Sequence, residues 1–169
     1  PALPLTLDEL YCSQNRLTEL PALPLTLVKL YCSQNQLTEL PALPSSTLAT
    51  LTCHQNELTE LPTLPLTLVE LNCSQNQLTK LPTLPLTLVK LDCRDNELTE
   101  LPTLPLTLTG LYCTDNNQLT ELPTLPSTLV SLYCSINLLE KLPKMPHTTM
   151  YIPYSQRPKP KYTRYYQKG

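Results

Sequence analysis

The sequence predicts a right-handed solenoid of seven short turns, each with one parallel β-strand and an extended return segment. Three features support this fold class. Seven cysteines recur at spacings of 20 or 21 residues. Each cysteine lies in the same sequence motif of leucines and one asparagine, and pairs of prolines recur at the same period. A fixed period near 20 residues is typical of folds in which each unit stacks on its neighbours to form one continuous core.

The strand of each turn is expected around its cysteine. From Leu30 to Ser33 the side chains alternate, so that Leu30 and Cys32 point inward and Tyr31 and Ser33 point outward. This alternation predicts a short strand with one buried face. The leucines of the repeat, such as Leu27, are expected to fill each turn.

The cysteines occupy inward strand positions, where a free thiol behaves as a small hydrophobic group. The chain has no closely spaced cysteine pairs of the kind that bind zinc, so we expect no metal site. An odd, evenly spaced set of thiols favours a reducing, intracellular setting. The expected buried thiols are Cys12, Cys32, Cys53, Cys73, Cys93, Cys113 and Cys134.

An asparagine follows each strand, where the chain turns and buried main-chain groups lack a sheet partner. Its amide offers both a donor and an acceptor to these groups. We therefore expect an asparagine ladder along the solenoid, made of Asn15, Asn35, Asn56, Asn76, Asn96, Asn116 and Asn137.

The return segment has the form Leu40-Pro41-x-Leu43-Pro44. Proline fixes φ and disfavours helix at the preceding residue, so this segment is expected to be extended, largely polyproline II. The position of Leu25 is taken by serine in the third and seventh repeats, which a buried site tolerates poorly. We expect this position at a partly exposed edge.

The pattern Leu27-x-x-Leu30-x-Cys32-x-x-Asn35-x-Leu37 resembles that of the leucine-rich-repeat family, and all seven units carry it. The proline-rich return is similar to the short subclass found in secreted effectors of Gram-negative pathogens and in repeat proteins of giant DNA viruses. The resemblance covers about residues 1–146 and implies the solenoid and the asparagine ladder. Some such effectors carry a separate ubiquitin ligase domain with a nucleophilic cysteine, but this chain has no cysteine outside its repeats.

Strand side chains that point away from the core form columns across one side of the sheet, here called the outer sheet face and expected to be concave. Solenoids use this surface for recognition, and tyrosine and arginine are enriched at interface hot spots. Aromatic pairs also suit strands for purely structural reasons, so both interpretations stay open. The candidate protein-binding residues are Tyr11, Tyr31, His54, Asp92, Arg94, Tyr112 and Tyr133.

No catalytic residues are expected. His54 shares a column with Ser33 and Ser74, but no carboxylate lies nearby to orient its imidazole.

Residues 147–169 form a separate C-terminal segment, a cap remnant followed by an extended tail. All fourteen acidic residues lie at or before Glu140, whereas seven of the twelve lysines and arginines lie from Lys141 onward. Such a basic tail suits an acidic protein surface, single-stranded nucleic acid, or a role in solubility alone. Its candidate binding residues are Tyr154, Arg157, Lys159, Lys161, Tyr162, Arg164, Tyr165 and Tyr166.

These features predict a protein that works by contact and not by chemistry, without cofactor, metal or membrane span. The leading hypothesis is a protein-protein interaction or structural scaffold protein, such as a component of a giant-virus capsid. The alternatives are the recognition module of a secreted bacterial effector and an accessory protein whose tail binds nucleic acid. Because the chain opens on Pro1 within a repeat, we expect residues before it. Self-association through the solenoid ends is also open.

Overall fold

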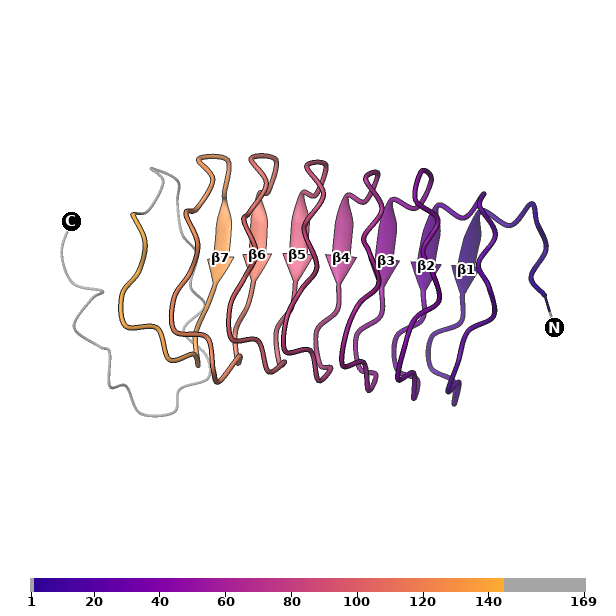
Figure 1. Cartoon of the computed structure of the whole chain (residues 1–169), viewed down its shortest axis with the longest axis horizontal. Helices are drawn as coiled ribbons and strands as arrows, with labels where there is room; N and C mark the ends of the chain where they lie inside the picture. Colours follow the sequence, from indigo (N-terminus) through magenta and orange to yellow (C-terminus); the bar gives the residue numbers. More distant parts are fainter. Residues whose placement is uncertain (1, 145–169) are drawn as a thin grey trace.

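The computed structural model describes residues 2–144 and shows the predicted solenoid (Figure 1). One parallel sheet of seven strands runs in sequence order along the molecule, and the described residues contain no helix. The predicted boundary between residues 146 and 147 lies outside the described residues. The strands are β1 (Glu9–Tyr11), β2 (Lys29–Tyr31), β3 (Thr50–Thr52), β4 (Glu70–Asn72), β5 (Lys90–Asp92), β6 (Gly110–Tyr112) and β7 (Ser131–Tyr133).

Each strand is only three residues long and begins one residue earlier than the side-chain alternation predicts. Hydrogen bonds between turns nevertheless continue past the strand. The amide of Cys32 donates to the carbonyl of Thr52 at 2.9 Å, and that of Gln34 donates to His54 at 2.9 Å. The parallel pairing therefore carries on into the turn, which holds successive turns in register.

The core is made of leucine and cysteine. In β2, Leu30 is fully buried, and Leu27, Cys32 and Leu37 of the same turn are also at 0% exposure. Full burial of one leucine side chain contributes about 1.5–3 kcal/mol. Since no Phe or Trp is present, the stability of each turn rests on these leucines.

The asparagine side chains join neighbouring turns. Asn76 Nδ2 donates to the carbonyl of Cys73 in its own turn at 3.0 Å and to that of Cys53 in the preceding turn at 3.1 Å. Its Oδ1 accepts from the amide of Leu58 at 3.0 Å. One side chain thus satisfies three main-chain groups that the sheet does not pair.

The residue before each asparagine adopts a left-handed conformation, which the sequence analysis did not anticipate. Its φ lies between 52° and 59° in all seven turns. Side chains other than glycine, asparagine and aspartate are uncommon in this region because Cβ crowds the main chain. These residues are Gln14, Gln34, Gln55, Gln75, Asp95, Asp115 and Ile136.

A ladder of threonines, also unanticipated, joins the turns before the strands. Thr87 Oγ1 donates to the carbonyls of Leu66 and Leu68 in the preceding turn, both at 2.8 Å. The sequence did hold a signal, because threonine occupies this position in every repeat although the residue before it varies. The threonines that bond to the preceding turn are Thr26, Thr47, Thr67, Thr87, Thr107 and Thr128.

Candidate functional site

Two stacked tyrosine pairs stand on the outer sheet face, one toward each end of the sheet. Strand pairing places Tyr11 beside Tyr31, and their rings stack with centroids 4.6 Å apart and planes inclined by 12°. The Tyr11 hydroxyl donates to Glu9 Oε2 at 2.9 Å, which fixes the ring from its far end. Tyr11 is 65% exposed, so much of this pair faces solvent.

The second pair carries an arginine. Tyr112 and Tyr133 stack with centroids 4.8 Å apart, and the Arg94 guanidinium lies 5.7 Å from the Tyr112 ring centroid. Arg94 Nε and Nη2 donate to the two carboxylate oxygens of Asp92 at 2.9 and 2.7 Å. This bidentate bond raises the pKa of Arg94 and holds the guanidinium plane in place.

The missing side chain at Gly110 makes room for the ring of Tyr112. A Cβ at this position would be only 3.2 Å from Tyr112 Cε2, which is tighter than an ordinary contact. The glycine therefore lets the ring lean over the first residue of β6. The sequence gives this strand a glycine where its neighbours carry Lys90 and Ser131.

The first residues of the strands form one column of the outer sheet face, and this column holds two ion pairs between neighbouring strands. Lys29 Nζ lies 2.7 Å from Glu9, and Lys90 Nζ lies 2.9 Å from Glu70. The hydrogen bond from Lys29 lowers the pKa of Glu9. Exposed pairs of this kind add little stability, so they mainly set the orientation of the side chains.

Two serines after the strands, at positions where the alternation predicts outward side chains, are buried, whereas Arg94 at the equivalent position is exposed. Ser33 and Ser74 are buried, and His54 is half-buried. The neighbouring turns contact each other at this position; the Ser33 amide, for example, donates to Ser13 Oγ at 3.1 Å. Of the described residues, neither Ser33 Oγ nor His54 Nδ1 finds a hydrogen-bond partner, so the two do not bond to each other. Burial lowers the pKa of His54 and favours the neutral ring.

The thiols are unsuited to nucleophilic chemistry in the folded chain. Burial raises the pKa of Cys32 to about 12 and that of Cys134 to about 11. The pKa of the fully buried Cys53 and Cys93 is raised as well, again chiefly by burial. All seven are free thiols, and residues 2–144 contain no cluster of side chains that could hold a metal ion.

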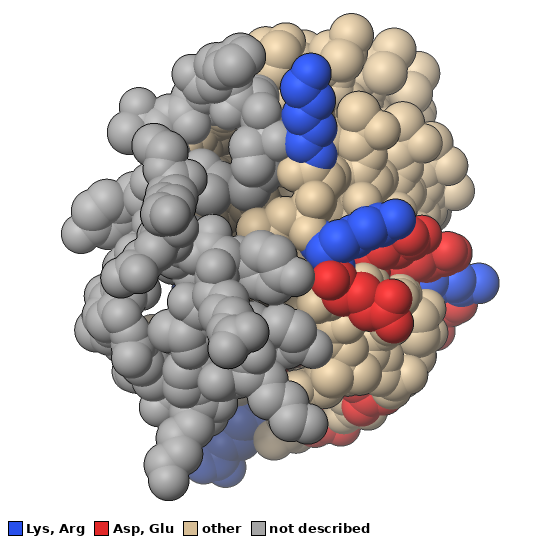
Figure 2. Space-filling view, turned by 90° about the vertical axis from the view of Figure 1, so that its left-hand side faces the viewer, with Lys and Arg blue, Asp and Glu red and all other residues tan. Residues whose placement is uncertain are grey.

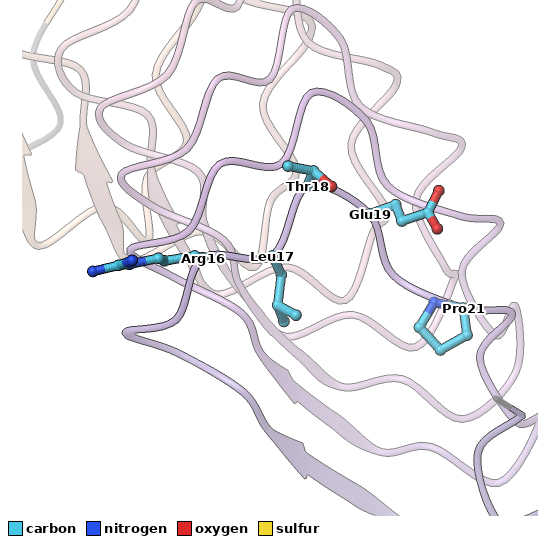
Figure 3. A pocket seen from close by; sticks show the side chains of 5 residues that line it. All are labelled: Arg16, Leu17, Thr18, Glu19 and Pro21. Atoms are coloured by element: carbon cyan, nitrogen blue, oxygen red, sulfur yellow. The ribbon is translucent and has the colours of Figure 1, made fainter.

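A shallow hollow of about 360 Å³ lies elsewhere, on the first turn (Figure 3). Its side chains point in different directions: Arg16 extends to one side of the chain and Glu19 to the other. None of the predicted binding residues lines it. The lining residues are Arg16, Leu17, Thr18, Glu19 and Pro21.

Solved structures share this repeat fold. YopM from Yersinia enterocolitica WA-314 is 42% identical, with a TM-score of 0.86, over 89% of this chain and 33% of its own. The chain has the leucine-rich-repeat solenoid fold. The repeat fold is similarly shared with the leucine-rich effector protein YopM from Yersinia pestis, which is 42% identical with a TM-score of 0.78 over 82% of this chain and 40% of its own. A Shigella effector leucine-rich-repeat domain is 39% identical with a TM-score of 0.76, over 80% and 61%.

This leucine-rich-repeat chain spans between a third and two thirds of the length of these structures. No protein-family model and no curated protein matches it. No helix in residues 2–144 is long and apolar enough to cross a membrane. The candidate binding residues of the tail, from Tyr154 to Tyr166, lie outside the described residues.

Proposed function

We propose that this leucine-rich-repeat chain is the non-catalytic recognition part of an effector-type protein, and that it binds a protein partner through the outer sheet face. The observation that carries the proposal is the presence of two stacked tyrosine pairs, one of them joined by an arginine. The similarity to Yersinia and Shigella effector repeats supports it.

The stacked pairs suit binding because they are already ordered. A partner that binds a free, flexible side chain must offset the entropy that the side chain loses. Tyrosine has few rotatable bonds, and here stacking restricts them further. The Asp92 carboxylate restrains Arg94 in the same way.

The spacing of the pairs indicates the size of the partner segment. From Tyr31 to Tyr112 the sheet advances by four strands, or roughly 19 Å at about 4.8 Å per strand. Between the two pairs, the same position at the end of each strand holds a smaller side chain, namely Thr52, Asn72 and Asp92. We expect the partner to place apolar or aromatic side chains against the tyrosine pairs and polar groups over this middle part.

A double variant tests the proposal. Tyr31→Ala with Tyr112→Ala removes one ring from each pair, whereas Gln36→Ala with Glu97→Ala changes two exposed side chains outside the outer sheet face. Partners captured from a host-cell extract by the immobilised wild type are compared by mass spectrometry, and the affinity of the main partner is measured by calorimetry. Loss of two hot-spot residues is expected to weaken binding by about 100-fold or more, and the control pair should change it by less than about threefold.

A partner that binds both double variants as tightly as the wild type would contradict the proposal. So would an extract that yields no partner specific to the wild type. The earlier predictions of a capsid component and of a protein- or nucleic-acid-binding tail stay predictions, and truncation after Pro146 separates the tail from the repeats for such tests.

A further inference from the structure

Five leucines are almost fully exposed, one in each of five turns. They lie in the short turn before the strand, and their exposed fractions run from 77% to 82%. A single exposed leucine is ordinary, but apolar side chains repeated in register form a contiguous patch of the kind that marks an interaction site. The five are Leu5, Leu25, Leu66, Leu86 and Leu106.

Three of them form an unbroken row, here called the leucine ridge: Leu66, Leu86 and Leu106, in three consecutive turns. An exposed serine stands at the same position in the turn on either side, Ser46 before the row and Ser127 after it. The order serine, three leucines, serine is the same in both directions along the solenoid. Its centre is Leu86.

The segments that contain the leucine ridge carry no charge. The segments 61–69, 81–89 and 101–109, which contain the three leucines, lack any Lys, Arg, Asp or Glu. Exposed threonines, Thr63 and Thr83 among them, lie in the same segments. Seen from the C-terminal end, the described residues show an uncharged area at the upper right, above the acidic side chains at the middle right (Figure 2).

We infer that the leucine ridge joins two copies of this chain, related by a two-fold axis that passes beside Leu86. Such an axis places Leu86 against its own counterpart, Leu66 against the other copy's Leu106, and Ser46 against the other copy's Ser127. A two-fold interface must be self-complementary, and a row that reads the same in both directions meets this requirement. The spacing of the leucines also matches, because both copies repeat at the same strand separation.

The area fits a weak dimer. At roughly 100 Å² of apolar surface for each leucine, six leucines from two copies bury about 600 Å². A specific interface needs about 1,000 Å² in total, so the flanking threonines and valines have to supply the rest. We therefore expect a dimer that forms reversibly as the concentration rises. An unrelated partner has no reason to carry the same leucine spacing and the same serine ends.

Sedimentation equilibrium of the full chain tests the inference. The apparent mass should rise with concentration from 19.0 kDa toward twice that value. Leu86→Glu brings two carboxylates together beside the axis and should weaken the dimer by at least about tenfold. The matched control is Leu25→Glu, which changes an equally exposed leucine outside the ridge and should leave the association unchanged. Because both positions face solvent, both variants should keep the wild-type circular dichroism spectrum.

Mixing two variants tests the position of the axis. Leu86→Glu and Leu86→Lys should each be monomeric alone, and their equimolar mixture should dimerise because opposite charges then meet at the axis. A wild type that stays at 19.0 kDa up to millimolar concentration overturns the inference. A dimer that Leu86→Glu does not weaken, or a mixture no more associated than its components, overturns it too. The tyrosine double variant described above should dimerise normally, which separates this contact from the proposed recognition surface.

Discussion

At the scale of single residues, the turn after each strand combines one costly feature with one stabilising feature. The residue at the left-handed position, such as Gln75, adopts a conformation that its Cβ disfavours. The following asparagine side chain makes four hydrogen bonds to main-chain groups of two turns. The ladder therefore holds the chain in a backbone conformation that the preceding residue alone would not select.

Asn76→Ala should lower the free energy of unfolding by about 2–4 kcal/mol, because it leaves main-chain groups of Cys53, Cys73 and Leu58 without this partner. Gln75→Ala should change it by less than about 0.5 kcal/mol, since both residues pay the same left-handed cost. Urea unfolding followed by circular dichroism measures both values. Equal unfolding curves for the two variants would count against the ladder.

The left-handed position also places two carboxylates in adjacent turns, Asp95 and Asp115. Desolvation, then the hydrogen bond and repulsion from Asp115, raise the pKa of Asp95, although Arg94 partly offsets this. A raised pKa in the folded state means that ionised Asp95 destabilises the fold. The penalty is present above the folded pKa and disappears as the pH falls through it toward the ordinary value of 3.8.

Asp95→Asn should therefore raise the melting temperature at pH 7 by about 1–3 °C at low salt, a small effect because the site is exposed. The gain over the wild type should shrink as the pH falls through the folded pKa of Asp95. Calorimetry at pH 7 and near pH 4 measures both. A gain that is independent of pH would show that only the preference of asparagine for the left-handed region is at work.

At the scale of the elements, side-chain hydrogen bonds join successive turns in the regions before and after the strands. The strands are three residues long, so the asparagines bond the turns after them and the threonines bond the turns before them. Each strand is thus flanked by a side-chain ladder on both sides. Such short strands pair in register because these ladders fix the adjoining turns.

Thr87→Val should lower the free energy of unfolding by about 1 kcal/mol, because it removes the bonds to Leu66 and Leu68 while keeping the shape of the side chain. The matched control is Thr83→Val, at an exposed position in the same turn. It should change the stability by less than about 0.5 kcal/mol. If the two variants unfold at the same urea concentration, the threonine ladder adds no stability.

The fold was predictable from the sequence because each signal is repeated seven times. The leucine frame and the prolines specify the parallel solenoid without a helix, which the described residues confirm. The left-handed positions were not predictable, because most of them hold glutamine or isoleucine, which rarely adopt this conformation. Nor was the burial of Ser33, which depends on where the chain begins to turn.

The candidate site was only partly predictable. The repeat register places Tyr112 beside Tyr133 in one column, and the two residues are paired between β6 and β7. The ring positions depend on local contacts that the pattern does not contain, namely the space above Gly110 and the carboxylate of Asp92 that orients Arg94. The sequence period specifies which residues are neighbours, and local packing determines the orientation of their side chains.

At the scale of the whole molecule, burial is uneven along the solenoid. Leu30, Leu51 and Leu91 are fully buried in the second, third and fifth strands, whereas Leu10 in the first strand is only partly buried. In a solenoid each turn is stabilised by its nearest neighbours, so turns covered on both sides are more stable than a turn covered on one side. When residues 1–169 are expressed alone, opening should therefore begin at the first turn.

Hydrogen exchange followed by mass spectrometry should show this gradient. Peptides around Leu51, Leu71 and Leu91 should exchange at least about 100-fold more slowly than the peptide around Leu10, because the central turns open only by near-global unfolding. Leu71→Ala should cost about 2–5 kcal/mol and speed exchange in the adjoining turns, whereas Leu10→Ala should cost less and act locally. Uniform protection along residues 2–144 would instead indicate one cooperative unit, and interfaces between turns strong enough to compensate for the exposed first turn.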